Sequence, residues 1–176
     1  DREWWGGGEG RGGAAVSVAL YQAGVMRTLR GHGRGCGLGG RRLLGGGPEG
    51  LARVRARGVQ GAVCTNKPAA LGPPLLQHLG IADAFSLVLG GDSLPQRKPS
   101  GEPLRHIAAH FGQAVDACLM VGDSLTDYRA AEDAGMPIAL VRYGYPRGLD
   151  LDNPHAVAGS DDLRELPGLA AGMPTR

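Results

Sequence analysis

The chain has 176 residues, of which 20% are charged, and a formal net charge of +2 at neutral pH. This length fits one domain with a hydrophobic core and is short for two. No apolar run reaches the ~18 residues that span a membrane, and the three cysteines form no CxxC pair. We therefore expect a cytoplasmic protein without a membrane anchor, a disulfide framework or a zinc site.

The composition changes near Pro48. Residues 1–50 hold 17 of the 32 glycines, and the other residues hold 15. Residues 1–60 carry a net charge of +6, whereas residues 61–176 carry −4. The chain therefore reads as two different kinds of sequence joined at this point.

The glycine-rich segment, residues 1–47, has few apolar side chains to offset the entropy cost of ordering its backbone, which is highest for glycine. We expect most of this segment to be disordered, with a helix possible only over residues 14–29. Residues 48–168 are expected to form the ordered core of the protein, and residues 169–176 are expected to form a tail.

Helical and strand patterns alternate after Pro48. Helices are expected over residues 48–58, 68–80, 100–112, 124–135 and 161–168. Strands are expected over residues 59–65, 85–90, 117–122 and 137–144. Pro73 and Pro74 must kink or restart the second helix, and Ser124 and Gly135 suit the start and the end of the fourth. Strands that alternate with helices of about ten residues are typical of an α/β fold with a parallel sheet.

Polar residues follow three of the predicted strands, and ligands of parallel sheets bind beyond these carboxyl ends. Thr65 and Asn66 come first, directly before the helix that begins near Pro68. A hydroxyl and an amide at this place can bind phosphate oxygens together with backbone N–H groups. They could equally serve only to cap the helix, and the sequence leaves both interpretations open.

Lys98 lies in the loop after the second predicted strand, between Arg97 and Pro99. Its ammonium group is a compact point charge that suits the stabilisation of charge on a phosphoryl group. An exposed surface lysine is the alternative interpretation.

Asp123 ends the third predicted strand, and Asp127 follows one helical turn later, so both carboxylates can face the same side. Paired carboxylates at this edge suit Mg²⁺, which takes a few oxygen ligands and keeps several waters. The alternative is a helix cap and an acid that the helix dipole favours.

The three groups in this order resemble the second, third and fourth motifs of the haloacid dehalogenase superfamily of phosphatases. More narrowly, the segments resemble the family of bacterial phosphoglycolate phosphatases: AVCTNKP, LGGDSLPQRKP, LMVGDSLTDYRAAEDAGMP and RYGYPRG. The resemblance covers roughly residues 48–148. It implies an α/β, Rossmann-like fold of three layers with a parallel sheet, and a small phosphorylated metabolite as substrate.

The resemblance also implies a mechanism. An aspartate after the first strand of the family attacks phosphorus, the aspartyl-phosphate is hydrolysed by water, and a second aspartate acts as acid and base. Thr65 and Asn66 would hold the phosphoryl group, and Lys98 would neutralise it. Asp123 would bind Mg²⁺, and Asp127 would bind the metal or orient its water. The reaction would convert 2-phosphoglycolate to glycolate and phosphate; another small phosphomonoester is the alternative substrate.

The first motif of the family, D-x-D-G-T after a strand, is absent before Thr65. We therefore expect this chain to lack the first, central strand of the sheet, to be poorly stable and to be inactive as a phosphatase. Truncation combined with a frameshift that ends near Pro48 would explain this, and residues 1–47 would then include the remnant of a helical cap. A genuine glycine-rich arm is the alternative to the frameshift. A catalytically inactive phosphatase-like protein is the alternative to an active enzyme.

A function of another class would be RNA binding by the Gly/Arg-rich arm. The arm has one true RGG sequence, at Arg11, and lacks the interleaved phenylalanine and tyrosine typical of such segments. We therefore do not expect nucleic acid to be a partner.

Overall fold

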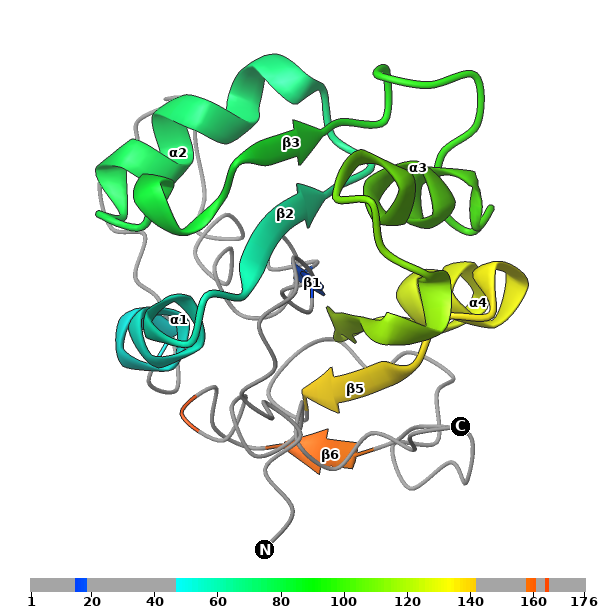
Figure 1. Cartoon of the computed structure of the whole chain (residues 1–176). Coiled ribbons are helices and arrows are strands. Elements are labelled where there is room, and N and C mark those ends of the chain that lie inside the picture. Colours follow the sequence, from blue (N-terminus) through cyan, green and yellow to red (C-terminus); the bar gives the residue numbers. More distant parts are fainter. Residues whose placement is uncertain (1–14, 19–46, 142–157, 161–163, 165–176) are drawn as a thin grey trace, which may run out of the picture.

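The computed structural model describes residues 15–18, 47–141, 158–160 and 164 (Figure 1). Its strands form one six-stranded sheet in the order β3-β2-β1-β4-β5-β6, and all neighbouring strands are parallel. The strands are β1 (Ala15–Val18), β2 (Gln60–Cys64), β3 (Leu87–Leu89), β4 (Cys118–Gly122), β5 (Ile138–Val141) and β6 (Ala158–Ser160). The α-helices are α1 (Gly47–Ala56), α2 (Gly72–His78), α3 (Glu102–His110) and α4 (Leu125–Ala134), with 3₁₀ helices at Ala69–Leu71, Ala82–Ala84 and Val115–Ala117. The predicted α/β fold with a parallel sheet is confirmed.

The centre of the sheet corrects one expectation. β1 occupies the position between β2 and β4 that the sequence analysis expected to be empty. Ala15 pairs with Gln60 on one side and with Cys118 on the other. This pairing provides backbone partners for two edges that would otherwise be buried without any. The sequence analysis allowed a helix over residues 14–29, but residues 15–18 form a strand, which their alternating valines favour.

Helices cover both faces of the sheet, with α1 and α2 on one side and α3 and α4 on the other (Figure 1). Alternate side chains of β4 divide between two cores, because successive residues of a strand point to opposite faces. One core contains Leu51, Val54, Val59, Val63, Leu75, Leu76, Ile81, Leu119, Val121, Ala139 and Val141. The other contains Ala62, Cys64, Leu89, Leu104, Ile107, Ala108, Cys118, Met120, Tyr128, Ala130, Ala131, Met136, Ile138 and Leu140. The three-layer arrangement implied by the family resemblance is therefore present.

The residues that the sequence analysis singled out mark the start and the end of α4 and the restart of the chain at α2. Ser124 caps α4, since its hydroxyl oxygen accepts a hydrogen bond from the backbone N–H of Asp127 at 3.3 Å. Gly135 ends α4 with a φ of 73°, a left-handed conformation that glycine adopts without steric cost. The 3₁₀ helix ends at Leu71 and α2 begins at Gly72, so the chain restarts at the two prolines as expected.

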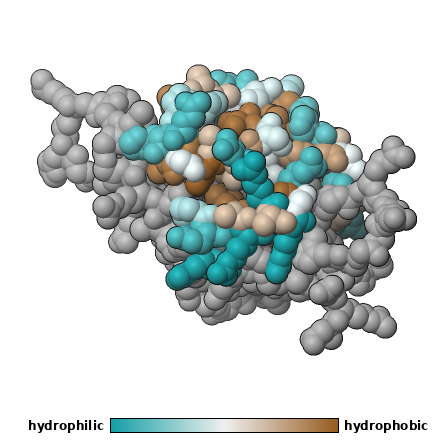
Figure 2. Space-filling model, turned by 60° about the vertical axis from the view of Figure 1, so that its left-hand side comes forward, coloured by the Kyte–Doolittle hydropathy of each residue, from teal (hydrophilic) through white to brown (hydrophobic). Residues whose placement is uncertain are grey.

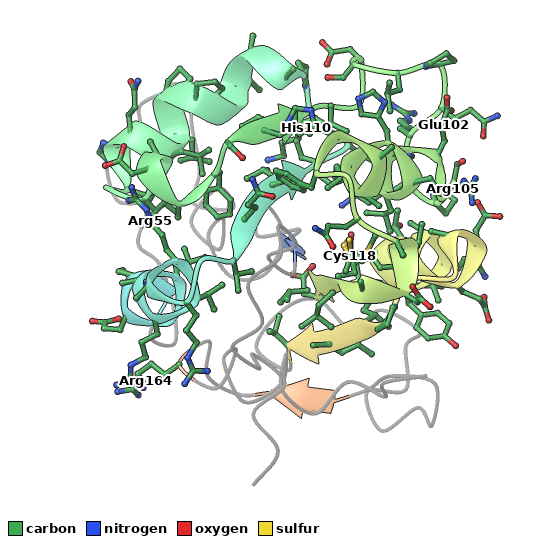
Figure 3. The ribbon with its side chains drawn as sticks, in the orientation of Figure 1. Arg55, Glu102, Arg105, His110, Cys118 and Arg164 are labelled. Atoms are coloured by element: carbon green, nitrogen blue, oxygen red, sulfur yellow. The ribbon has the colours of Figure 1, made fainter. Side chains whose placement is uncertain are left out.

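Cys118 begins β4 and is buried within the second core (Figure 3). Burial, with a smaller contribution from the charge of Asp116, raises the pKa of its thiol to about 11. The thiol is therefore neutral at physiological pH and behaves as a small apolar side chain.

Asp133 joins α4 to the start of α3. Its Oδ2 accepts a hydrogen bond from the backbone N–H of Gly101 at 2.6 Å, and Arg105, on the outer side of α3 in Figure 3, contacts the same oxygen at 3.3 Å. The Gly101 hydrogen bond, and then the charge of Arg105, hold the pKa of Asp133 below its ordinary value, with burial opposing them. The carboxylate thus links the two helices that cover one face of the sheet.

Replacement of Asp133 with asparagine is expected to weaken the dependence of the free energy of unfolding on pH in the acid range. The folded pKa lies below the unfolded value of 3.8, so the contribution of this group is present above that pH and is lost as the pH falls through the folded pKa. Urea unfolding between pH 2 and 5 should show a smaller loss of stability in D133N than in the wild type. Parallel curves for the two proteins would contradict this role.

Several expectations lie outside the described residues. The predicted last helix, residues 161–168, is described only at Arg164, and the tail is not described. Residues 1–47, most of which were expected to be disordered, are described only at β1 and at the first residue of α1. β6 was not predicted. None of the helices in the described ranges is long and apolar enough to cross a membrane.

Candidate functional site

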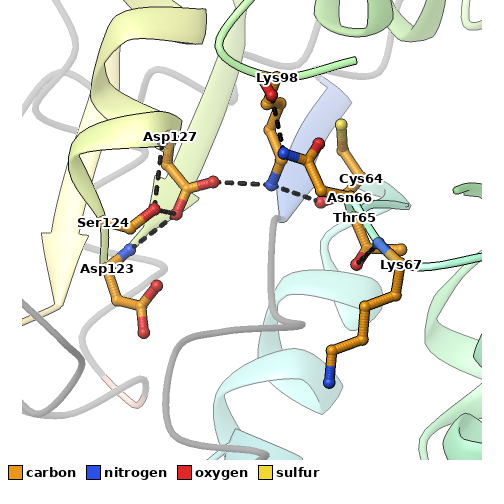
Figure 4. Close-up of polar contacts among 8 residues, drawn as sticks. All are labelled: Cys64, Thr65, Asn66, Lys67, Lys98, Asp123, Ser124 and Asp127. Carbon is orange, nitrogen blue, oxygen red and sulfur yellow. Dashed lines mark hydrogen bonds and ion pairs between the residues drawn. The ribbon is translucent and has the colours of Figure 1, made fainter. Parts of the chain in front are cut away.

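Four polar or charged side chains are buried in the described part of the chain, and all four were singled out by the sequence. They are Thr65 (4% exposed), Lys98 (3%), Asp123 (0%) and Asp127 (0%). Polar groups are costly to bury without partners, so their collection at one edge of the sheet requires a specific arrangement. Figure 4 shows them gathered around the carboxyl ends of β2 and β4.

Lys98 connects the two sides of this arrangement. Its Nζ donates hydrogen bonds to Asp127 Oδ1 at 2.6 Å and to the carbonyl oxygen of Cys64, the last residue of β2, at 2.8 Å. β1 lies between β2 and β4 in the sheet. The ammonium group therefore extends from the end of β2 to the start of α4, across the carboxyl end of the central strand (Figure 4).

Both carboxylate oxygens of Asp127 are engaged by protein donors. Oδ1 pairs with Lys98, and Oδ2 accepts from the Ser124 hydroxyl at 2.7 Å and from the backbone N–H of Asp123 at 3.2 Å. Such a reciprocal cap holds the start of α4. The helix-cap interpretation is confirmed, and the capping carboxylate is also the partner of the buried ammonium. The metal-binding role of Asp127 stays a prediction.

The phosphate-binding candidates are held by the same network. Asn66 Nδ2 donates to the carbonyl oxygen of Lys98 at 2.7 Å, and Thr65 Oγ1 accepts from the backbone N–H of Lys67 at 3.1 Å. Asn66 Oδ1 is buried, and no donor among the described residues reaches it. Buried acceptors normally have a partner, so this oxygen marks a place where water or a ligand could donate.

Cys64 does not provide a substitute nucleophile. Its side chain is 2% exposed. Burial raises the pKa of its thiol; the charge of Lys98 opposes this shift and that of Asp127 adds to it. Since the thiolate is the reactive form of cysteine, the protonated thiol at this position is inert.

The donor set suits a hard cation. Asp123 is buried at the end of β4 and offers carboxylate oxygens, the ligand type that Mg²⁺ prefers. Within the described ranges, no three His, Cys, Asp or Glu side chains lie together as a complete metal site. A single carboxylate fits Mg²⁺, which is commonly bound through one or two carboxylates together with waters and phosphate oxygens.

The comparisons with known proteins agree with this architecture. The model of the family described as haloacid dehalogenase-like hydrolase matches residues 22–135, more than half of the chain. The chain belongs to the haloacid dehalogenase-like hydrolases. The family resemblance inferred from the three motifs is confirmed.

Individual members of this family are similar over part of their length. A phosphoglycolate phosphatase from Nitrosococcus oceani is 42% identical over 69% of this chain and 54% of its own. One from Neisseria meningitidis is 51% identical over 54% of this chain and 41% of its own. The crystal structure of a predicted phosphoglycolate phosphatase from Haemophilus somnus superposes with a TM-score of 0.65 at 34% identity, over 69% of this chain and 54% of that one. The chain thus spans about half the length of the relatives that it matches.

Sequence reasoning found the buried residues of the site but not the contacts among them. It did not identify the Cys64 carbonyl as a partner of Lys98, or Ser124 as a donor to Asp127. It assigned Asn66 to the phosphoryl group and did not predict that the Asn66 amide donates to the Lys98 backbone. The aspartate that the family carries after its first strand has no counterpart here, as the sequence analysis expected, because residues 2–82 contain no aspartate.

Proposed function

We propose that the site belongs to a phosphomonoester hydrolase that acts on 2-phosphoglycolate, and that this chain carries its phosphoryl- and Mg²⁺-binding residues without its nucleophile. The observation that supports this most is the burial of Thr65, Lys98, Asp123 and Asp127 at one edge of the sheet. The names of the related phosphoglycolate phosphatases support the choice of substrate. Another small phosphomonoester is the alternative.

Each residue of the site has a role in this proposal. The Thr65 hydroxyl binds a phosphoryl oxygen, and the Lys98 ammonium neutralises charge that develops on the phosphoryl group. Asp123 holds Mg²⁺, which when bound polarises a phosphoryl oxygen. Asp127 orients Lys98, since both of its oxygens already accept hydrogen bonds from the protein. The Asn66 amide holds the Lys98 backbone through a hydrogen bond. Its Oδ1 remains available to accept a hydrogen bond from water or a ligand.

This sequence lacks the aspartate that performs the nucleophilic step in the family. In the family, the nucleophile is an aspartate after the first strand, and no aspartate occurs among residues 2–82. Cys64 is buried with a raised pKa and cannot replace it. We therefore propose that the chain binds phosphomonoesters without hydrolysing them.

Calorimetric titration with 2-phosphoglycolate, with and without Mg²⁺, tests this function. We expect saturable binding that strengthens with Mg²⁺, no binding of glycolate, and no release of phosphate over hours. Equal binding of a series of small phosphomonoesters would favour the alternative substrates. Phosphate release above that of buffer would contradict the proposed absence of turnover, and no binding of any phosphomonoester would contradict the function.

A further inference from the structure

Two loops carry the anion-binding groups, and direct contacts join them. The first, the threonine loop, is residues 65–69, and the second, the lysine loop, is residues 90–98. The backbone N–H of Gly91 donates to the carbonyl oxygen of Lys67 at 2.8 Å. Asp92 Oδ1 accepts from the backbone N–H of Ala69 at 2.8 Å. With the bond from Asn66 to Lys98, these contacts attach the threonine loop at three places along its length.

Asp92 caps the 3₁₀ helix that begins at Ala69, because the residue before that helix is a proline. The 3₁₀ helix Ala69–Leu71 begins after Pro68, which makes no side-chain cap. Proline has no side-chain acceptor, so the first N–H of this helix needs a partner from elsewhere. Asp92 supplies it from 23 residues further along the chain. The cap of this helix is therefore also a connection between the two loops.

Two glycines bring the loops close enough for this contact. A Cβ at Gly90 would lie 2.2 Å from the backbone nitrogen of Ala69, and a Cβ at Gly91 would lie 2.4 Å from the carbonyl oxygen of Asn66. Both are closer than real Cβ atoms approach other atoms, so the loops pack backbone against backbone. Asp92 directly follows these glycines, and its side chain extends to the backbone N–H of Ala69.

We propose that Asp92 is a positioning residue, which clamps the threonine loop to the lysine loop and so sets the distance between Thr65 and Lys98 on a bound phosphoryl group. This inference rests on the proposed function, because it assumes that the two residues share one ligand. The carboxylate acts as a hydrogen-bond acceptor, and it does not touch the ligand.

Three variants of the full chain separate this role from a general effect on stability. D92A removes the acceptor, so phosphate must itself order the threonine loop on binding. We expect affinity for inorganic phosphate to fall by about five- to tenfold, the equivalent of one such hydrogen bond. D92N keeps an oxygen at the same place and should bind within about twofold of the wild type. D133A is the matched control, because Asp133 also accepts from a backbone N–H, that of Gly101, but at α3. It should reduce the melting temperature without changing phosphate affinity.

Hydrogen exchange of the Ala69 amide provides a second readout that needs no ligand. Exchange should accelerate in D92A and remain slow in D92N and D133A. Equal phosphate affinity of D92A and the wild type would overturn the proposal, as would equal weakening in D92A and D133A or in D92A and D92N. If the wild type binds no phosphate, the proposed function fails and so does the ligand-positioning role; exchange at Ala69 then shows whether the clamp itself exists.

Discussion

Replacement of Lys98 with methionine is expected to destabilise the protein by about 3–5 kcal/mol and to abolish phosphate binding. Methionine keeps most of the length of the side chain but removes the charge. Asp127, which is 0% exposed, would then keep a buried negative charge with only the Ser124 hydroxyl and the Asp123 N–H to stabilise it. The large cost comes from this uncompensated charge and not from the intrinsic strength of the ion pair.

The double variant K98M/D127N tests that explanation. Asparagine retains an oxygen for the Asp123 N–H and the Ser124 hydroxyl while removing the charge. Urea unfolding at 25 °C should show the double variant to be more stable than K98M alone, with a coupling energy of about 1–3 kcal/mol. If the effects of the two substitutions simply add, or if K98M costs less than about 0.5 kcal/mol, the pair is not coupled as described.

Replacement of Asp123 with asparagine is expected to remove the effect of Mg²⁺ on phosphate binding. The substitution preserves shape at the end of β4 but replaces a charged ligand with a weaker neutral one. We expect the apparent affinity for Mg²⁺, measured by titration in the presence of 2-phosphoglycolate, to fall by more than about tenfold.

D116N is the control for this experiment. Asp116 is an exposed aspartate in the 3₁₀ helix that precedes β4, so the variant makes the same chemical change at the opposite end of the strand that Asp123 follows. Mg²⁺ affinity should be unchanged in D116N. An equal decrease in both variants would indicate a general effect of net charge and would remove Asp123 from the metal site.

The sequence predicted most of the fold because its signals are local. Apolar runs gave β2, β3, β4 and β5, and Ser124 and Gly135 marked the limits of α4. The strands β1 and β6 were not predicted. The partners of β1 are residues around Gln60 and Cys118, which are distant from it in the sequence. The alternating valines of residues 15–18 suit a strand, but its place between β2 and β4 depends on the assembled sheet.

The candidate site was predictable to a similar extent. Thr65, Lys98 and Asp123 follow three strands, and the geometry of parallel sheets brings such positions together. The connections among them could not be predicted, because they join loops that are distant in sequence. Asn66 and Lys98 are 32 positions apart in the sequence, yet a 2.7 Å hydrogen bond joins them in the folded chain. Only the folded chain shows that Asp127 binds Lys98 with one oxygen and caps α4 with the other.

A positively charged surface elsewhere on the molecule must be distinguished from this site. Figure 2 brings the α1 side of the molecule forward and shows hydrophilic side chains grouped there. The exposed residues of α1 and of the turn that follows it include Arg53, Arg55 and Arg57. A phosphorylated ligand attracted only by positive charge would bind to these arginines, and its affinity would fall steeply with added salt.

The most direct test of the account is the location of a bound phosphomonoester on the full chain. Two-dimensional ¹H–¹⁵N spectra should be recorded during titration with 2-phosphoglycolate and Mg²⁺. The account predicts that the amide signals of Thr65, Asn66, Lys98 and Asp123 shift together with one dissociation constant. Shifts confined to the arginines of α1, with these four signals unmoved, would contradict it.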